Sequence, residues 1–209
     1  MAQQNVLDRG QVILLNKIGE MSPDMQQNFK KANTVYGDAV YYKRYEVTGG
    51  GGLINVLYND DAIKDGYCNL SKQKIAQGCA FLIQKMTLRV AIVDAQITSG
   101  ESTIDNPADE AMVTYGTVAA ATASPVLQNA ELELDIAQKK ICQIPFNAFN
   151  QEGTNVDSEK NSYVLSAPKL TTYNDELQFR IHFPQSKSLP SDKKIFVEVA
   201  LHGAELRIG

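Results

Sequence analysis

Apolar and polar residues alternate along most of this 209-residue chain with a period of two residues. The alternation is strict over residues 131–136 and 177–183, and it recurs over residues 194–208, where Gly203 interrupts it. A period of two is typical of a β-strand with one buried face, so these segments are predicted strands. Further strands are predicted at residues 11–18, 38–47, 53–58, 140–145 and 162–166, and residues 80–97 fit either one long bent strand or two strands.

Helix and turn signals lie between these strands. Pro23 follows Ser22, an arrangement that fits a capped helix with proline in its first turn, so a helix is predicted from residue 23 to about residue 32. The four glycines at positions 49–52 predict the flexible tip of a hairpin formed by the two strands that flank them. A helical turn is predicted near residues 71–75.

The remaining connections are read from their turn residues. Ala137 and Gln138 predict a tight reversal between two strands, and Gly203 predicts a bulge or bend in the last strand. Residues 98–107 and 146–161 are predicted loops, and residues 108–124 fit either a helix or a long loop.

Eight or nine strands with long connections and few helices favour a mainly β chain. The predicted fold is an antiparallel β-sandwich, a single jelly roll with one or two short helices. Residues 1–36 are expected to form an N-terminal arm with a short helix, and residues 37–209 the sandwich. An immunoglobulin-like domain fits less well, because the chain has no Trp and is about twice the usual length. A parallel α/β fold is disfavoured because helices do not alternate regularly with the strands.

Composition and charge narrow the choice of partners. No apolar run approaches the roughly 20 residues that span a bilayer, so no membrane span is expected. Lys and Arg total 20 against 24 Asp and Glu, and the net charge of -4 is the wrong sign for a protein that mainly neutralises phosphates. Nucleic acid is therefore not expected as the main partner. The first fifteen residues lack the features of a secretory signal, which predicts synthesis in a cytoplasm.

Candidate chemistry along the chain has plain structural interpretations. The glycines at 49–52 lack the Lys-Ser/Thr of a phosphate loop, and Asp60, Asp61 and Asp65 lack the ligand spacing of a calcium loop. His182 and His202 fall on the polar faces of their strands, and a metal site would need further ligands brought in by the fold. No catalytic, cofactor-binding or metal-binding residue is predicted, and no cofactor is expected.

The three cysteines give no sign of a disulfide framework. Cys68, Cys79 and Cys142 are an odd number and form no Cys-x-x-Cys pair. Reduced, partly buried thiols are therefore expected.

Three carboxylates share one face of a predicted strand. Glu131, Glu133 and Asp135 alternate with apolar residues, which places neighbouring acids about 7 Å apart. That separation resembles the spacing of the acids of an inverting glycosidase. Such enzymes usually draw the pair from different strands and line the groove with Trp, which this chain lacks. A hydrated sheet face is the simpler interpretation, and the chain is not expected to be an enzyme.

Three segments of the C-terminal half carry a resemblance to a known class of protein. They read AELELDIAQKKICQIPFNAF, YVLSAPKLTTYNDELQFRIHFP and KKIFVEVALHGAELRIG, and together they cover residues 130–207. In this pattern a charged hairpin ends in a Pro-Phe step, an alternating strand follows, and the last strand ends in a His-Gly step and an Arg. The pattern resembles the end of jelly-roll structural proteins of bacteriophages, in particular the coat proteins of tailless icosahedral phages.

The resemblance implies a virion component that works by self-association. It implies a trimer or pentamer within a larger shell, contacts with other virion proteins, no cofactor and no active site. The expected location is the virion, after synthesis in the host cytoplasm. The alternative is a carbohydrate- or receptor-binding β-sandwich module of a spike, fibre or lectin type, which would bind glycans with Ca²⁺ and with surface aromatics such as Tyr41, Tyr42, Tyr45 or Tyr58. A third possibility is glycan hydrolysis by the three carboxylates.

Overall fold

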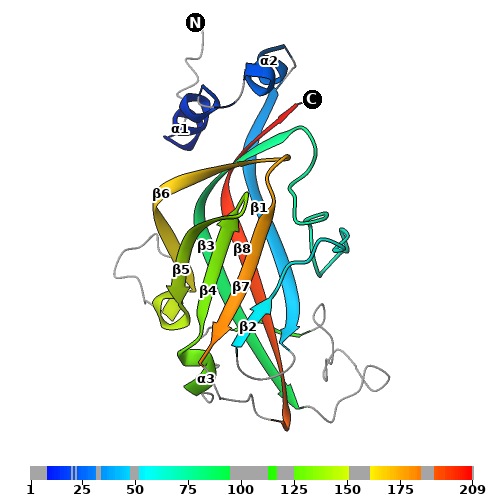
Figure 1. Cartoon of the computed structure of the whole chain (residues 1–209), viewed down its shortest axis with the longest axis vertical. Coiled ribbons are helices and arrows are strands. Elements are labelled where there is room, and N and C mark those ends of the chain that lie inside the picture. The colour runs from blue at the N-terminus through cyan, green and yellow to red at the C-terminus, as the bar shows by residue number, and fades with distance from the viewer. Residues whose placement is uncertain are drawn as a thin grey trace, which may run out of the picture.

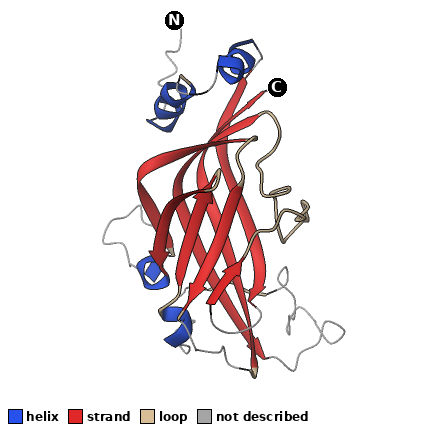
Figure 2. Cartoon of the chain, viewed as in Figure 1, coloured by secondary structure: helices blue, strands red, loops and turns tan. Residues whose placement is uncertain are grey.

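The fold is mainly β, and the described residues form eight strands in two antiparallel sheets (Figures 1 and 2). It is described from a computed structural model. The structure describes residues 9–19, 21, 23–31, 34–47, 52–94, 113–116, 125–150, 161–184 and 191–208. This arrangement is compatible with the predicted β-sandwich.

Each sheet has four strands. In spatial order, sheet A consists of β1 (Thr34–Val47), β8 (Lys193–Ile208), β3 (Cys79–Asp94) and β6 (Ser162–Thr172). Sheet B consists, in the same sense, of β2 (Gly52–Asn55), β7 (Leu177–Phe183), β4 (Glu131–Ile136) and β5 (Lys139–Pro145). The helices of the described chain are α1 (Arg9–Ile18), α2 (Pro23–Lys31), α3 (Pro125–Gln128) and the 3-10 helix η1 (Phe146–Asn150).

The strands pair from the two ends of the chain inwards. β1 pairs with β8, β2 with β7, β3 with β6 and β4 with β5. Two further pairs, β3 with β8 and β4 with β7, complete the two sheets. All six pairs are antiparallel, and most of them join strands that are far apart in the sequence.

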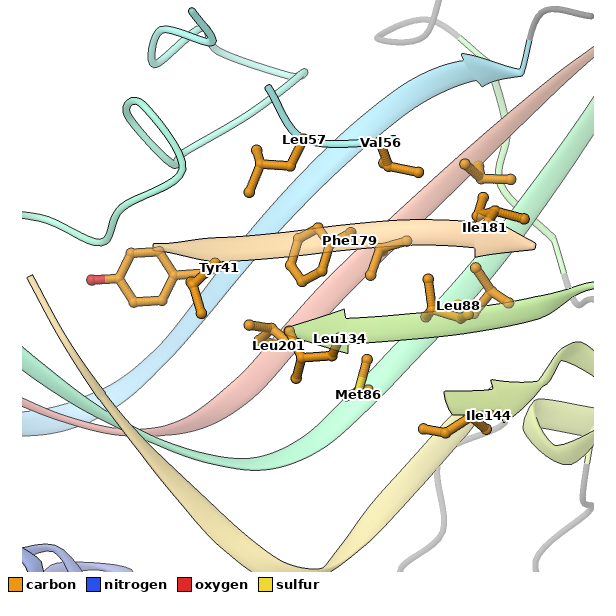
Figure 3. Close-up of a cluster of buried hydrophobic side chains, with 14 of the residues drawn as sticks. Tyr41, Val56, Leu57, Met86, Leu88, Leu134, Ile144, Phe179, Ile181 and Leu201 are labelled. Atoms are coloured by element: carbon orange, nitrogen blue, oxygen red, sulfur yellow. The ribbon is translucent and has the colours of Figure 1, made fainter. Parts of the chain in front are cut away.

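The core lies between the inner faces of the two sheets (Figure 3). Sheet B contributes Phe179 and Ile181 from β7, and sheet A contributes Met86, Leu88 and Leu201, all of which are fully buried. The burial of β7 alternates strictly along its length. The period-two pattern of the sequence therefore identified the inner face of this strand correctly.

The segment predicted as the first strand, residues 11–18, is a helix instead. It lies within α1, whose buried residues Leu14 and Ile18 are four positions apart and so share one helix face. They pack with Leu82 and Leu206 on the outer face of sheet A. A short apolar run fits either a strand or a helix locally, and here the contact with the sheet decides between them. The helix predicted from residue 23 is confirmed as α2.

The predicted hairpin between residues 38–47 and 53–58 is wrong. The first segment lies in β1 of sheet A, and the second begins with β2 in sheet B. The glycines at 49–51 lie outside the described residues. Two neighbouring strands of suitable composition predict a hairpin, but here each strand finds a partner near the other end of the chain.

The long apolar segment that begins near residue 80 is a single strand with a bulge. In β3, Ile83 pairs with Gly203 and Lys85 pairs with His202, so that Gln84 is the extra residue. The predicted irregularity at Gly203 is therefore present, but the inserted residue belongs to the neighbouring strand. The bulge moves the inward-facing positions of β3 from odd residues such as Phe81 to even residues such as Met86.

The hairpin of β4 and β5 is confirmed. Its two turn residues, Ala137 and Gln138, have φ angles of 49° and 63°, as expected for the tight turn that suits a two-residue hairpin. The helical turn predicted near residues 71–75 is instead a reverse turn, in which a bridge joins Ser71 and Lys74.

The other predicted connections are only partly described. The loop expected at 146–161 begins with η1, and residues 151–160 lie outside the described part. Of residues 98–124, the structure describes only 113–116, which include a bridge between Gly116 and Val90. The strand predicted at 162–166 extends to Thr172 as β6.

Candidate functional site

The three carboxylates of β4 lie on the outer face of sheet B. Residues of the two neighbouring strands face them across the sheet, because Glu133 is paired with Arg180 of β7 and with Gln143 of β5, and Glu131 is paired with His182. We refer to five side chains on this face as the sheet B cluster: Glu133, Asp135, Lys140, Arg180 and His182.

Glu133 is the centre of the sheet B cluster. Arg180 Nη1 lies 2.8 Å from Glu133 Oε1 and 2.8 Å from Asp135 Oδ2, so one guanidinium joins the two acids. The other oxygen of Glu133 accepts a charge-assisted hydrogen bond from Lys140 and lies 3.1 Å from His182 Nε2. Three basic side chains from two strands therefore surround one carboxylate.

These contacts bury the acids that were predicted to face water. Glu133 is 2% exposed and Asp135 is 4% exposed, so the interpretation of a hydrated sheet face is wrong for both. One oxygen of Asp135 is buried without a hydrogen-bond partner among the described residues. The sequence places the acids on the outer face, but it does not show that long basic side chains of β5 and β7 cover them.

The charge state of Glu133 follows from two opposing effects. Burial alone would raise the pKa of the Glu133 carboxyl, because a buried charge loses its hydration. The hydrogen bonds from Lys140 and Arg180 and the charges of Lys140 and His182 outweigh it, and the pKa is lowered below its ordinary value of 4.5. An ionised, enclosed carboxylate is poorly suited to donate a proton to a leaving group.

Glu133→Gln is expected to lower stability at neutral pH and to weaken its dependence on acid. The folded-state pKa of Glu133 is depressed, so its stabilisation is present above the ordinary pKa and is lost as pH falls through the folded-state pKa. We expect a loss of about 1–3 kcal/mol in the free energy of unfolding at pH 7. This loss should shrink as the pH falls below the ordinary pKa of 4.5. Urea unfolding at several pH values measures both effects.

Glu131→Gln is the matched control, because Glu131 lies on the same face of β4 and accepts its hydrogen bond from the uncharged amide of Gln143. It should leave the pH profile nearly unchanged. Parallel profiles for wild type and Glu133→Gln would contradict the electrostatic role of Glu133.

The outer face of sheet A carries a second polar arrangement, built from rows across β1, β8 and β3. Arg44, Glu198 and Arg89 form one row, because Glu198 is paired with Arg44 on one side and with Arg89 on the other. Glu198 Oε2 accepts a hydrogen bond of 2.7 Å from Arg44 Nε, and Arg89 Nη1 lies 3.5 Å from Oε1. The Glu198 side chain is 9% exposed and the Arg89 side chain 47%.

Arg44 is fixed by several further contacts. Its Nη1 donates to the Gly66 carbonyl at 2.8 Å. Its guanidinium carbon lies 5.0 Å from the centre of the Tyr115 ring and 5.6 Å from that of Tyr42, within the range of cation–π attraction. Arg44 is therefore a rigid part of this face.

Two neighbouring rows extend this face into a shallow hollow. One row consists of Tyr42, Ala200 and Thr87, and the next of Val40, His202 and Lys85. Thr87 Oγ1 lies 3.0 Å from His202 Nε2. We refer to the depression over these rows, bounded on the β6 side by Val164, as the sheet A hollow; it has parts of about 130 Å³ and 390 Å³ that share Val40 and His202.

The two histidines thus lie in different places. His182 belongs to the sheet B cluster, and His202 lies in the sheet A hollow. Within the described part of the chain, no three His, Cys, Asp or Glu side chains gather as a metal site requires. The sequence did not single out Arg44, Arg89 and Glu198, and only the register across the three strands brings them into one row.

The tyrosines considered for glycan binding have different roles. Tyr41 is buried, and its hydroxyl donates to the carboxylate of Glu205. Burial and the neighbouring Glu205 raise the pKa of Tyr41, which keeps the phenol protonated. The hydroxyls of Tyr45 and Tyr58 lie 3.3 Å apart, and Tyr58 is 40% exposed.

The cysteines are free thiols, as predicted. Cys68 and Cys79 are buried, and Cys142 is half-buried. Burial raises the pKa of all three thiols, which keeps them protonated and weakly nucleophilic.

The three aspartates considered for a cation are engaged differently. Asp61 pairs with Lys43 of β1, with Oδ1 2.6 Å from Nζ. Asp60 and Asp65 are exposed in the segment that follows β2. The interpretation of a solvated turn fits Asp60 and Asp65, whereas Asp61 is half-buried in its ion pair.

Comparison with known proteins provides no relative from which a role could be transferred. The chain matches no protein-family model, no curated protein and no solved structure. None of the helices that the structure describes has the length and apolar character needed to cross a bilayer. The two sites are therefore interpreted from their geometry alone.

Proposed function

We propose that this chain is a jelly-roll structural protein that self-assembles as a capsid, or coat, component of a bacteriophage. The observation that carries this proposal is the strand pairing. A jelly roll is a long antiparallel hairpin rolled up, so that its first strand pairs with its eighth, the second with the seventh, the third with the sixth and the fourth with the fifth. The four outside-in pairs of this chain follow that scheme. Jelly rolls are common in viral capsids.

The pattern of residues 130–207 supports the virion role within that fold. Jelly rolls also occur in lectins and cupins, so strand pairing by itself does not select a function. The resemblance to phage coat proteins rests on segments that fold as β4 to β8. The fold and the resemblance therefore support the same class of protein from different observations.

The chemistry of the sheet B cluster favours a structural role over catalysis. Glu133, the best-placed acid, is enclosed by three basic side chains and is held ionised. This arrangement stabilises the outer face of sheet B and does not offer a proton donor to a substrate. Glycan hydrolysis by the carboxylates of β4 receives no support from it.

The N-terminal arm offers one surface for neighbouring subunits. The buried side of α1 packs on sheet A of its own chain through Leu14 and Ile18. On the same helix Val12 and Leu15 are 43% and 49% exposed and three positions apart, so they form an adjacent apolar pair. In an assembly this pair would be covered by another subunit, as expected for an arm that joins neighbours.

A carbohydrate- or receptor-binding module is the alternative. The observation that favours it is the pair of Tyr45 and Tyr58, whose ring centres are 6.2 Å apart beside the edge of β1. An exposed aromatic ring with a hydroxyl offers both an apolar face and a hydrogen bond to a sugar.

Purified wild-type protein is expected to form discrete trimers, pentamers or larger shells. Light scattering over a range of protein concentrations measures the mass, and electron microscopy shows the symmetry of the particles. A mass that stays monomeric at high concentration would overturn the capsid proposal. Saturable binding of an immobilised glycan by that monomer would support the alternative instead.

A further inference from the structure

An acidic loop with an exposed isoleucine projects beside sheet A. It follows β2 and comprises residues 58–65, and we refer to it as the Ile63 loop; the segment that contains it is drawn in teal beside β1 in Figure 1. Ile63 is 61% exposed, and both Asp60 and Asp65 are exposed. Ile63 is therefore an apolar knob with two exposed acids near it. The neighbouring Lys64 is also exposed, and its Nζ lies 3.6 Å from the centre of the Tyr67 ring.

The base of the Ile63 loop is firmly held. Asp61 Oδ1 pairs with Lys43 of β1 at 2.6 Å, and Asp61 Oδ2 accepts a hydrogen bond of 2.8 Å from the Tyr58 backbone. The backbone carbonyl of Asp61 accepts a hydrogen bond of 2.8 Å from Lys72. These contacts fix the loop to β1 while Ile63 stays exposed, so the knob is presented in a defined position.

The sheet A hollow has the complementary character. Val40 of β1 and Val164 of β6 are 45% and 67% exposed, and they stand on either side of the part whose volume is about 390 Å³. Lys85 lies between them, and Arg89 follows further along β3 with its side chain 47% exposed. The hollow therefore combines apolar walls with the basic side chains of Lys85 and Arg89. Its lining also includes two acids, Asp38 and Glu198, and Glu198 is paired with Arg44 and Arg89.

We propose that the Ile63 loop of one subunit docks into the sheet A hollow of the next. This inference rests on the proposed self-assembly and names the contact that would produce it. Ile63 would lie between Val40 and Val164, while Asp60 and Asp65 would approach Lys85 and Arg89. Opposite charges around an apolar centre set the orientation of two partners and favour the correct pairing.

Other exposed apolar side chains fit this hollow less well. Val12 and Leu15 lie on α1, whose last turn carries the basic Lys17 and whose first turn has no acid to meet the basic side chains of the hollow. Leu53 lies within a strand of sheet B, where it cannot project as a loop does.

The knob and the hollow are different surfaces of one chain. Each subunit can then bind one neighbour through its loop and another through its hollow. Repeated head to tail in this way, the contact is heterologous and builds a ring where the rotation closes or an open filament where it does not. A closed ring agrees with the trimer or pentamer expected of the proposed capsid component.

Charge reversal tests the contact directly. The hollow variant carries Lys85→Glu and Arg89→Glu, and the loop variant carries Asp60→Lys and Asp65→Lys. Each variant alone should need about tenfold or more protein to reach half-assembly, because like charges then meet at the contact. A chain that carries all four reversals should assemble again, since each loop then finds a hollow of opposite charge in a ring of any subunit number. Light scattering measures assembly, and circular dichroism confirms that the three variants are folded.

A second pair of variants tests the apolar centre without any change in charge. Ile63→Ser should weaken assembly, and Leu53→Ser, at a side chain that is 55% exposed, should not. Unchanged assembly of Ile63→Ser or of the folded hollow and loop variants would overturn the docking contact while the capsid proposal stands. Failure of the folded chain with all four reversals to assemble would also overturn it. A wild-type protein that never assembles would overturn the capsid proposal itself.

Discussion

Gly203→Ala is expected to destabilise the protein severely or to prevent it from folding. A Cβ atom at position 203 would lie 1.9 Å from the carbonyl oxygen of Leu82 and 2.9 Å from its carbonyl carbon. Both are backbone atoms of β3, which is paired with β8 at this point and cannot move aside as a flexible side chain does. We expect the free energy of unfolding to fall by more than about 4 kcal/mol, as measured by urea or thermal unfolding.

Gly37→Ala is the matched control for this substitution. Gly37 also lies in a strand of sheet A, yet a Cβ atom there would meet no heavy atom within 4 Å. The expected change is within about 0.5 kcal/mol, as for other surface substitutions. Equal unfolding midpoints for Gly203→Ala and wild type would show that the two strands can separate at the bulge, contrary to the expectation.

The reason for this close approach is the bulge in β3. Inward-facing residues are Phe81 and Ile83 before the bulge and Met86 and Leu88 after it, and only an extra residue at Gln84 allows both pairs to reach the core. The backbone around the extra residue comes close to β8, and a residue without a side chain is required opposite it. Glycine at 203 is thus tied to the packing of β3.

Arg180→Met is the second substitution with a large expected effect. It removes the cation that lies 2.8 Å from both Glu133 and Asp135 and keeps most of the apolar volume. The two acids, at 2% and 4% exposure, would lose their shared partner and stay enclosed. We expect the free energy of unfolding at pH 7 to fall by about 2–4 kcal/mol. This loss is smaller than for a fully buried ion pair because the Arg180 side chain is 28% exposed. Chemical unfolding at neutral pH measures it.

The control for Arg180→Met is Arg89→Met on the other sheet. Arg89 is 47% exposed and lies 3.5 Å from Glu198, which keeps its shorter bond to Arg44. Its loss should lower the free energy of unfolding by less than about 1 kcal/mol.

A double variant tests the coupling between Arg180 and Glu133. Adding Glu133→Gln to Arg180→Met should lower the free energy of unfolding by less than the sum of the single changes, because the two side chains share one interaction. Strict additivity would contradict the coupling between Arg180 and Glu133.

Much of the fold follows from local pattern. The alternation in β4, in β7 and in β8 as far as Leu201 determined both the strands and their inner faces, because a strand turns successive side chains to opposite sides. Pro23 marked the start of α2, and Ala137 with Gln138 marked the turn of the β4–β5 hairpin. These features depend on a few neighbouring residues, so the sequence alone is enough to predict them.

Pairing between distant strands could not be predicted in the same way. β1 and β2 are neighbours in the sequence with suitable composition for a hairpin, yet they belong to different sheets. The local pattern of residues 11–18 fits either a strand or a helix. They form a helix because one helix face then packs against Leu82 and Leu206. In both cases the decision depends on contacts with residues far away in the chain.

The same distinction between local pattern and contacts of distant strands applies to the candidate sites. Alternation in the sequence determined that Glu131, Glu133 and Asp135 share the outer face of their strand. Only the tertiary structure decided that Arg180 of β7 and Lys140 of β5 cover Glu133 and Asp135, and that Arg44, Glu198 and Arg89 form one row across sheet A. The physical reason is that strand period is a local property of the backbone, whereas burial and charge pairing depend on which strands lie side by side.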